Sequence, residues 1–129
     1  MPRIMVIDDQ PSIRRALELV LTRAGYDVLL AADGREGMRR CAAAAPDLVI
    51  TDLHMPGADG LETIAGLRAI HPRLPVIAMS GGDQSVMLKL LESAALLGAV
   101  STLQKPFTVP EVLEAVRRVL QPGERPAEG

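Results

Sequence analysis

Four short apolar runs in the chain end on side chains that could take part in chemistry. In chain order these side chains are Asp8 and Asp9, Asp52, Ser80 and Lys105. If brought together, the carboxylates would repel, because two unit charges 4 Å apart cost about 4 kcal/mol at an effective dielectric of about 20. A bound Mg²⁺ would relieve that repulsion, since it prefers oxygen ligands. A cation, an ammonium and a hydroxyl around Asp52 are the groups needed for phosphoryl transfer to a carboxylate.

Each of these groups has a simpler explanation when it is taken alone. Asp8 and Asp9 could cap a helix and favour its positive end. A lone Asp52 at the end of a strand is more often a turn former, and Ser80 opens a Ser-Gly-Gly stretch that could be a plain turn. Lys105 could be the solvated end of a strand. Their joint occurrence after successive apolar runs favours one common site.

The apolar runs are typical of strands that are buried on both faces of a parallel sheet. The predicted strands cover residues 4–7, 27–31, 48–52, 75–79 and 100–104. Helical spacing of apolar residues predicts helices over 11–24, 36–45, 61–71, 85–97 and, with Thr108 as its cap, 109–120. Asp33-Gly34 is expected to form a turn before the second helix. Five strand–helix alternations predict one parallel sheet with helices on both faces and right-handed crossovers.

The strand order decides whether the polar groups meet. All carboxyl ends of a parallel sheet emerge at the same edge. If the first and third strands are neighbours, as in the order 2-1-3-4-5, the acidic ends of both strands share one crevice at the switch point.

Composition places the chain among single-domain proteins of ordinary size. It has 129 residues, a net charge of -2, no long basic run and one cysteine, Cys41. No nucleic-acid-binding surface is therefore expected, and no internal disulfide can form. The apolar run near the N-terminus is too short for a signal peptide or a membrane span. These features predict a cytoplasmic protein that binds neither membranes nor nucleic acid.

Five separated motifs resemble the CheY-like receiver domains of bacterial two-component response regulators. They are Val6-Ile7-Asp8-Asp9, Asp52-Leu53-His54-Met55-Pro56, Asp59-Gly60-Leu61-Glu62, Ser80-Gly81 and Lys105-Pro106-Phe107. The resemblance covers residues 3 to about 120 and implies a flavodoxin-like (βα)5 fold, a doubly wound parallel sheet of order 2-1-3-4-5 in a single domain. A receiver domain over residues 1–121 and a disordered tail over 122–129 are expected.

The resemblance also implies the roles of individual residues. Asp52 would accept a phosphoryl group from a sensor histidine kinase or a phosphotransfer protein. Asp9, Asp52 and the backbone carbonyl of His54 would hold Mg²⁺, with Mn²⁺ as a substitute, and Asp8 would assist through a water molecule. The side chain of His54 has no implied role.

The same resemblance assigns the remaining site residues. Ser80 and Lys105 would contact the phosphoryl group. Thr102 occupies the switch position three residues before the lysine, where the family usually has an aromatic residue, so a swinging ring is not available. The segment from Ser80 to Lys105 is also longer than usual, and the predicted fourth helix is strongly apolar. Its surplus apolar surface would either bind a partner or a second copy, or be covered by neighbouring loops.

A stand-alone phosphoacceptor switch is the first functional hypothesis. Phosphorylation would alter the face formed by the fourth helix, fifth strand and fifth helix, which would bind an unknown target protein or form a homodimer. The chain would be no enzyme beyond its own phosphoryl transfer and dephosphorylation. The alternative is a constitutive binding module that keeps the fold and signals without phosphate. A hydrolase would need an Asp-x-Asp pair and a dinucleotide reductase a Gly-x-Gly-x-x-Gly motif, and neither follows the first strand.

Overall fold

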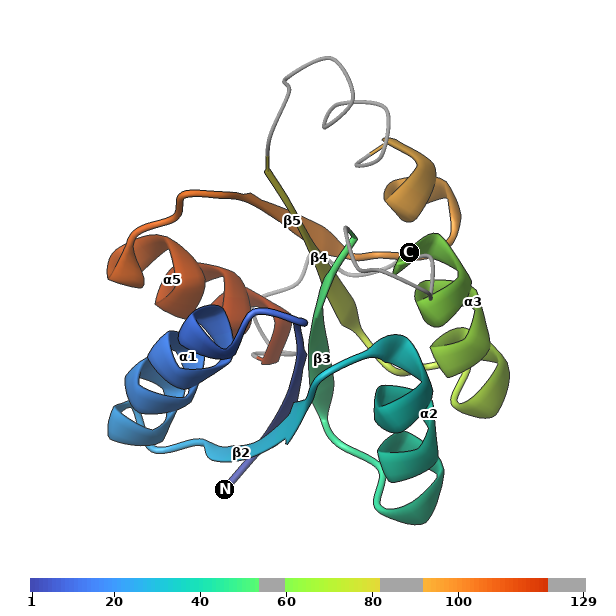
Figure 1. Ribbon diagram of the computed structural model, residues 1–129, viewed down its shortest axis with the longest axis horizontal. Coiled ribbons are helices and arrows are strands. Elements are labelled where there is room, and N and C mark those ends of the chain that lie inside the picture. The colour runs from blue at the N-terminus through green and yellow to red at the C-terminus, as the bar shows by residue number, and fades with distance from the viewer. Residues whose placement is uncertain (54–59, 82–91, 121–129) are drawn as a thin grey trace.

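Five parallel strands form a single sheet in the computed structural model, which describes residues 1–53, 60–81 and 92–120. The strands are β1 Arg3–Ile7, β2 Asp27–Ala31, β3 Leu48–Asp52, β4 Val76–Ser80 and β5 Ser101–Gln104. The helices are α1 Pro11–Arg23, α2 Gly34–Ala43, α3 Gly60–Ile70 and α5 Val109–Leu120, and residues 92–96 are also helical. The strand order is β2-β1-β3-β4-β5, which confirms the predicted flavodoxin-like topology (Figure 1).

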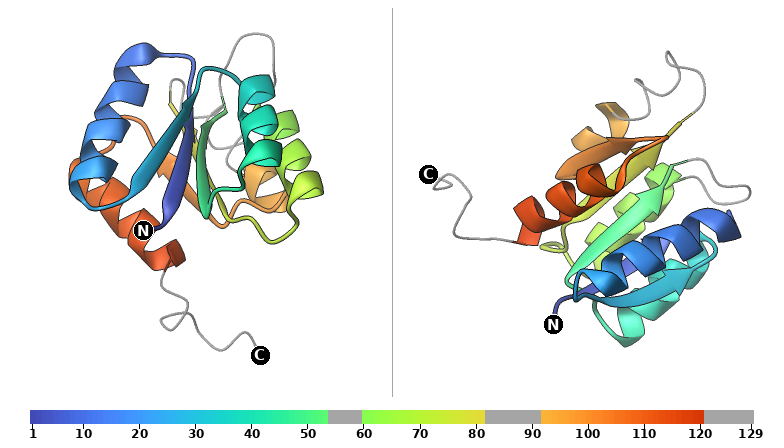
Figure 2. Two further views of the ribbon diagram at one scale, coloured as in Figure 1. Left: turned by 90° about the horizontal axis from the view of Figure 1, so that it is seen from below. Right: turned by 90° about the vertical axis from the view of Figure 1, so that its left-hand side faces the viewer.

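Helices cover both faces of the sheet, and the alternation of side chains along each strand explains why. On one face α1 and α5 pack against alternate strand residues, among them Ile4, Val6 and Ile50. On the other face α2, α3 and the 92–96 segment pack against the intervening residues, among them Met5 and Ile7. Figure 2 shows the three resulting layers from two further directions.

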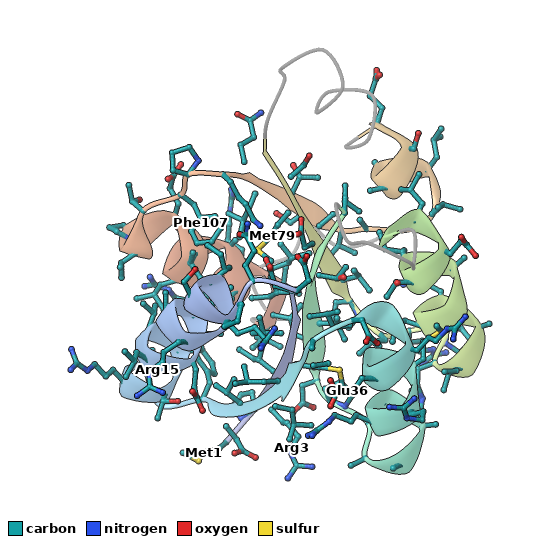
Figure 3. All side chains as sticks on the ribbon, viewed as in Figure 1. Met1, Arg3, Arg15, Glu36, Met79 and Phe107 are labelled. Carbon is teal, nitrogen blue, oxygen red and sulfur yellow. The ribbon has the colours of Figure 1, made fainter. Side chains whose placement is uncertain are left out.

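The central strands are buried on both sides, as their continuous apolar runs predict. All five residues of β3 and of β4 are buried, whereas the outer strand β2 is mostly half-buried and β5 has two exposed residues. Met79 and Phe107, labelled in Figure 3, lie on the α1–α5 side, where Phe107 packs against the buried cluster that contains Met79. Mostly aliphatic side chains therefore pack on both faces of the central strands and fix the positions of the strand ends.

Local signals set the ends of the helices. Pro11 begins α1 and Gly25, with a φ of 98°, follows its end, as expected from the sequence. Thr108 and Glu111 form a reciprocal cap at the start of α5, in which each side chain accepts from the other's backbone N–H. The turn predicted at Asp33-Gly34 is instead the start of α2, because the Asp33 side chain caps the helix by accepting from Glu36 N at 2.9 Å.

Two further sequence predictions meet the structure only in part. The predicted fourth helix is described only over residues 92–96, and its remainder lies outside the described residues, as does the tail predicted over 122–129.

Cys41 is fully buried on α2, and burial raises the pKa of its thiol. None of the described helices is long and apolar enough to cross a membrane.

Candidate metal and phosphoryl site at the carboxyl edge of the sheet

The predicted site residues come from the ends of four adjacent strands. Asp8 and Asp9 follow β1, Asp52 ends β3, Ser80 ends β4 and Lys105 follows β5. The register brings these ends level, since Ile7 pairs with Thr51, Asp52 with Met79, and Ser80 with Gln104. The prediction that the first and third strands are neighbours is therefore confirmed, and with it the shared edge.

Three carboxylates meet at this edge. One oxygen of each of Asp8, Asp9 and Asp52 lies within 4.8 Å of the others. Asp8 is fully buried, Asp52 is 3% exposed, and Asp9 is the most open to solvent. Buried carboxylates at such distances need positive charge beside them, because little water remains to screen their repulsion.

Lys105 supplies part of that positive charge. Its Nζ lies 2.9 Å from Asp8 Oδ2 and 3.4 Å from Asp52 Oδ2, and its side chain is only 18% exposed. The Lys105 backbone N–H also donates to the carbonyl oxygen of Ser80 at 2.7 Å, which fixes β5 beside the end of β4. The ammonium therefore stands between the first and third strand ends and bridges their carboxylates.

Ser80 brings an unused hydroxyl to the same edge. Its Oγ is fully buried and has no hydrogen-bond partner within the described parts of the chain. The next residue, Gly81, passes close to Lys105, because a Cβ at position 81 would lie 3.0 Å from the Lys105 Cβ. A buried hydroxyl without a partner is costly, so its presence here points to a ligand that it can bond.

Arg14 is a residue of this region that sequence reasoning missed. The amphipathic pattern of the first helix assigns it to the solvent face, yet it is half-buried, and its Nη1 donates to the backbone carbonyl of Asp8 at 2.7 Å. The signal that could have found it is its spacing, since Arg14 lies one helical turn after Gln10, the residue that follows the two acids. A long cation there can reach back over the loop.

One predicted site residue, Thr102, is not part of this cluster. Thr102 lies in β5 opposite Ala78 and is exposed, so its hydroxyl is at the surface of the sheet's outer strand. His54 lies outside the described residues.

The donor set fits a hard divalent cation. Three carboxylates with converging oxygens are the ligands that Mg²⁺ takes in proteins, and no sulfur or imidazole group joins the described cluster. The remaining orphaned hydroxyl of Ser80 and the ammonium of Lys105 are suited to an anion next to that cation. The cluster can thus bind a cation and a tetrahedral oxyanion together.

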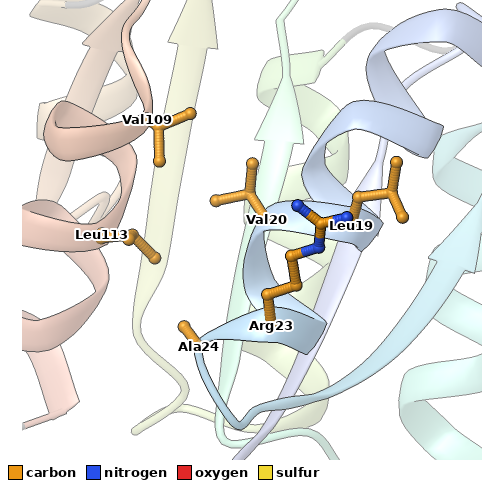
Figure 4. Close-up of a pocket in the computed structure, with 6 residues that line it drawn as sticks. All are labelled: Leu19, Val20, Arg23, Ala24, Val109 and Leu113. Atoms are coloured by element: carbon orange, nitrogen blue, oxygen red, sulfur yellow. The ribbon is translucent and has the colours of Figure 1, made fainter.

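A separate groove of about 280 Å³ lies between α1 and α5, on one face of the sheet (Figure 4). It is lined by Leu19, Val20, Arg23, Ala24, Val109 and Leu113. None of these residues is a carboxylate or belongs to the acidic cluster. The groove therefore does not compete with the carboxyl edge as a metal site.

The topology and the acidic edge together define the class of CheY-like receiver domains. The chain belongs to the response regulator receiver domain family, whose pattern matches residues 4–117. It is therefore a receiver domain of the kind used in two-component signalling.

Individual relatives support this assignment. The chain is 32% identical to sporulation initiation phosphotransferase F of Bacillus subtilis, over 92% of this chain and 93% of that protein. It is 39% identical to the response regulator MprA of Mycolicibacterium vanbaalenii, of which it spans 50%, and 36% identical to the DNA-binding regulator NtrC of Escherichia coli, of which it spans 24%. Some relatives are thus about as long as this chain, and others are at least twice as long.

Solved structures agree with the fold. Chemotaxis protein CheY4 of Vibrio cholerae superposes with a TM-score of 0.83 at 32% identity, over 93% of this chain and 99% of that one. The receiver domain of NtrX from Brucella abortus gives a TM-score of 0.86 at 29% identity, over 92% and 98%.

Proposed function

We propose that this receiver domain is switched by phosphorylation of Asp52, with a sensor histidine kinase or a phosphotransfer protein as the donor. The observation that carries the proposal is the position of the Asp52 carboxylate. It is almost completely buried, lies within 4.8 Å of the Asp8 and Asp9 oxygens, and has the Lys105 ammonium 3.4 Å away. Phosphorylation-based switching is general to the family to which the chain belongs.

The acidic residues would hold the divalent cation. Asp9, Asp52 and the backbone carbonyl of His54 are the proposed direct ligands, and Asp8 acts through a water molecule. When bound, Mg²⁺, or Mn²⁺ in its place, supplies positive charge that offsets both the carboxylates and the phosphoryl oxygens. Asp8 already accepts from Lys105 and from the Gln10 backbone N–H, which supports its indirect role.

The transfer itself breaks one bond and forms one bond. An Asp52 oxygen attacks the phosphorus of the donor's phosphohistidine, and the P–N bond breaks as the new O–P bond forms. The leaving imidazole keeps the electron pair and takes up a proton. Lys105 then pairs with a phosphoryl oxygen, and the Ser80 hydroxyl, which lacks a partner in the described structure, donates to another.

The signal would leave through a protein surface. We assign the output to the face formed by the 92–96 segment, β5 and α5, which binds an unknown target protein or a second copy of the chain. Three apolar residues near this face are exposed, namely Leu96 at 89%, Leu97 at 40% and Val100 at 51%. We further propose that this switch acts in the cytoplasm through protein contacts, without direct nucleic-acid binding.

The second candidate is a constitutive binding module with a receiver fold. It is favoured by Thr102, an exposed residue that has no ring to move at the switch position. Beryllofluoride with Mg²⁺ separates the two candidates, because it mimics the phosphoryl group. Changed amide chemical shifts along β5 and α5 support the phosphorylation switch, whereas shifts confined to the acidic edge support the constitutive module.

Labelling with a radioactive small phosphodonor, such as acetyl phosphate, tests the acceptor. The wild-type chain should take up protein-bound phosphate that is labile to both acid and base, as an acyl phosphate is, and only when Mg²⁺ is present. Asp52→Asn should take up none. The matched control is Asp47→Asn. Asp47 immediately precedes the first residue of β3, at the end of the strand opposite Asp52, and its carboxylate accepts from the Arg3 backbone N–H. Retained label in Asp52→Asn, or equal labelling of the wild type in EDTA, would refute the assignment.

A further inference from the structure

Every polar group of Asp8 is held by a different part of the chain. Its backbone N–H donates to Ala31 O in β2 at 3.2 Å, and its carboxylate accepts from Gln10 N and Lys105 Nζ, both at 2.9 Å. Its carbonyl oxygen accepts from Arg14 Nη1 at 2.7 Å. The first three contacts belong, in that order, to the sheet, the loop after β1 and the proposed phosphoryl site. The fourth comes from the first helix and has no part in the proposed function.

The Arg14 contact acts on Asp9 as much as on Asp8. The Asp8 carbonyl and the Asp9 amide form one planar peptide unit. A hydrogen bond that holds the Asp8 carbonyl oxygen therefore also restrains the Asp9 backbone, from which the Asp9 side chain extends. Among the described residues none bonds to the Asp9 carboxylate, which joins the 4.8 Å cluster through the placement of its backbone. A charge-assisted hydrogen bond is among the stronger restraints available to such a loop.

We propose that Arg14 is a positioning residue for the divalent-cation site, which it keeps assembled by clamping the Asp8–Asp9 peptide. The inference rests on the proposed function only in that the acidic cluster binds a cation. Outer contacts that orient metal ligands typically contribute tenfold or more to metal affinity. The hydrogen bond of Arg14 is with a backbone carbonyl and not with a carboxylate oxygen, so Arg14 would act through the acids.

A purely electrostatic role for Arg14 predicts the opposite result. The cluster carries three carboxylates against the one ammonium of Lys105, and a nearby guanidinium repels an arriving cation. Removing Arg14 would then tighten cation binding. The clamp predicts weaker binding, because the Asp9 oxygen is no longer held near its two neighbours.

Mn²⁺ binding to the unphosphorylated chain measures the clamp directly. Free Mn²⁺ is followed by electron paramagnetic resonance during titration of the wild type, Arg14→Ala, Arg14→Lys and Arg15→Ala. We expect a dissociation constant raised about tenfold in Arg14→Ala. Arg14→Lys keeps the charge on a shorter stem without the planar fork, so its affinity should fall between the two. Arg15→Ala, which removes a neighbouring exposed charge, should bind like the wild type.

Phosphorylation by acetyl phosphate at varied Mg²⁺ separates positioning from a direct role. In Arg14→Ala the Mg²⁺ concentration for half-maximal labelling should rise by the same factor, and the maximal rate should equal that of the wild type. Thermal unfolding in EDTA should match that of Arg15→Ala, which excludes general damage to the fold.

Three outcomes would overturn the inference. These are unchanged or tighter Mn²⁺ binding by Arg14→Ala, binding by the control Arg15→Ala that is weakened as much as in Arg14→Ala, or a lowered maximal rate of Arg14→Ala with unaltered Mn²⁺ affinity. A wild-type chain that binds Mn²⁺ but is never labelled on Asp52 overturns the proposed function and leaves the clamp standing. A wild type that does not bind Mn²⁺ overturns both.

Discussion

Ser80 shows at the scale of one residue how the site departs from a plain protein core. A buried polar atom without a partner costs about 1–3 kcal/mol, and most folded proteins avoid it. Ser80 Oγ lies in that state among the described residues, at the end of a strand whose five residues are all buried. The cost is understandable if the hydroxyl is kept for a phosphoryl oxygen.

Ser80→Ala should therefore separate stability from function. We expect the free energy of unfolding to rise by about 1 kcal/mol, because an unpaired hydroxyl is removed from a buried place. Labelling by acetyl phosphate should slow by about tenfold to a hundredfold, the value of one hydrogen bond to a charged group. Urea unfolding and initial labelling rates measure the two effects.

A control on the neighbouring strand makes this comparison specific. Ser101→Ala changes a half-buried serine at the first residue of β5, opposite Ile77 and away from the carboxyl edge. It should leave the labelling rate unaltered. A Ser80→Ala chain that is less stable than the wild type, or that is labelled equally fast, would contradict the prediction.

At the scale of the element, α3 is set directly against the strand that carries the acceptor. Gly60 begins this helix and is buried, and a Cβ there would lie 2.8 Å from the carbonyl oxygen of Asp52 and in contact with the backbone of Leu53. Because backbone atoms cannot move aside as a flexible side chain can, only glycine fits at this contact. The start of α3 is thereby tied to the end of β3.

Gly60→Ala should destabilise the protein and disturb the acceptor. Alanine is a better helix former than glycine by about 1 kcal/mol, but the clash with backbone should outweigh this gain and leave a net loss of about 1–2 kcal/mol. Labelling of Asp52 should slow as its backbone shifts. Urea unfolding and acetyl phosphate labelling measure both changes.

Gly66→Ala is the matched control on the same helix. A Cβ at position 66 meets the thioether end of Met38, a side chain that can rotate away. Its stability should lie within about 1 kcal/mol of the wild type, and its labelling rate should be unaltered. Equal effects of the two substitutions would mean that the backbone contact at Gly60 is unimportant.

The elements themselves were largely predictable from the sequence, whereas the contacts between them were not. The buried strands are continuous apolar runs, so β3 and β4 came within a residue of their predicted bounds. The polar groups at the strand ends could be located because parallel strands share one edge. The clamp from Arg14 and the cap from Asp33 were missed, because amphipathic spacing and turn signals do not show which backbone group a side chain reaches.

At the scale of the whole molecule, the acidic edge opposes folding until a cation arrives. Three clustered carboxylates are offset by Lys105, which leaves an excess of negative charge at one end of the sheet. Repulsion of this kind is present only in the folded chain, where the strand ends converge. Repulsion among the three carboxylates should therefore lower the free energy of unfolding of the metal-free protein, and binding of a divalent cation should raise it again.

Asp9→Asn tests this coupling between the site and global stability. In EDTA this variant should unfold at a higher temperature than the wild type, because one of three repelling charges is gone. Mg²⁺ should stabilise the wild type by about 2.7 kcal/mol at one hundred times its dissociation constant and should stabilise the variant much less. Thermal unfolding by circular dichroism, with NaCl added to match ionic strength, separates binding from screening.

Asp33→Asn is the matched control, because it alters a carboxylate that caps α2 outside the cluster. It should keep the full response to Mg²⁺, since asparagine caps a helix about as well as aspartate. An Asp9→Asn chain that is less stable than the wild type in EDTA, or that gains as much from Mg²⁺, would show that the acids at the sheet edge do not act as one cation-binding unit.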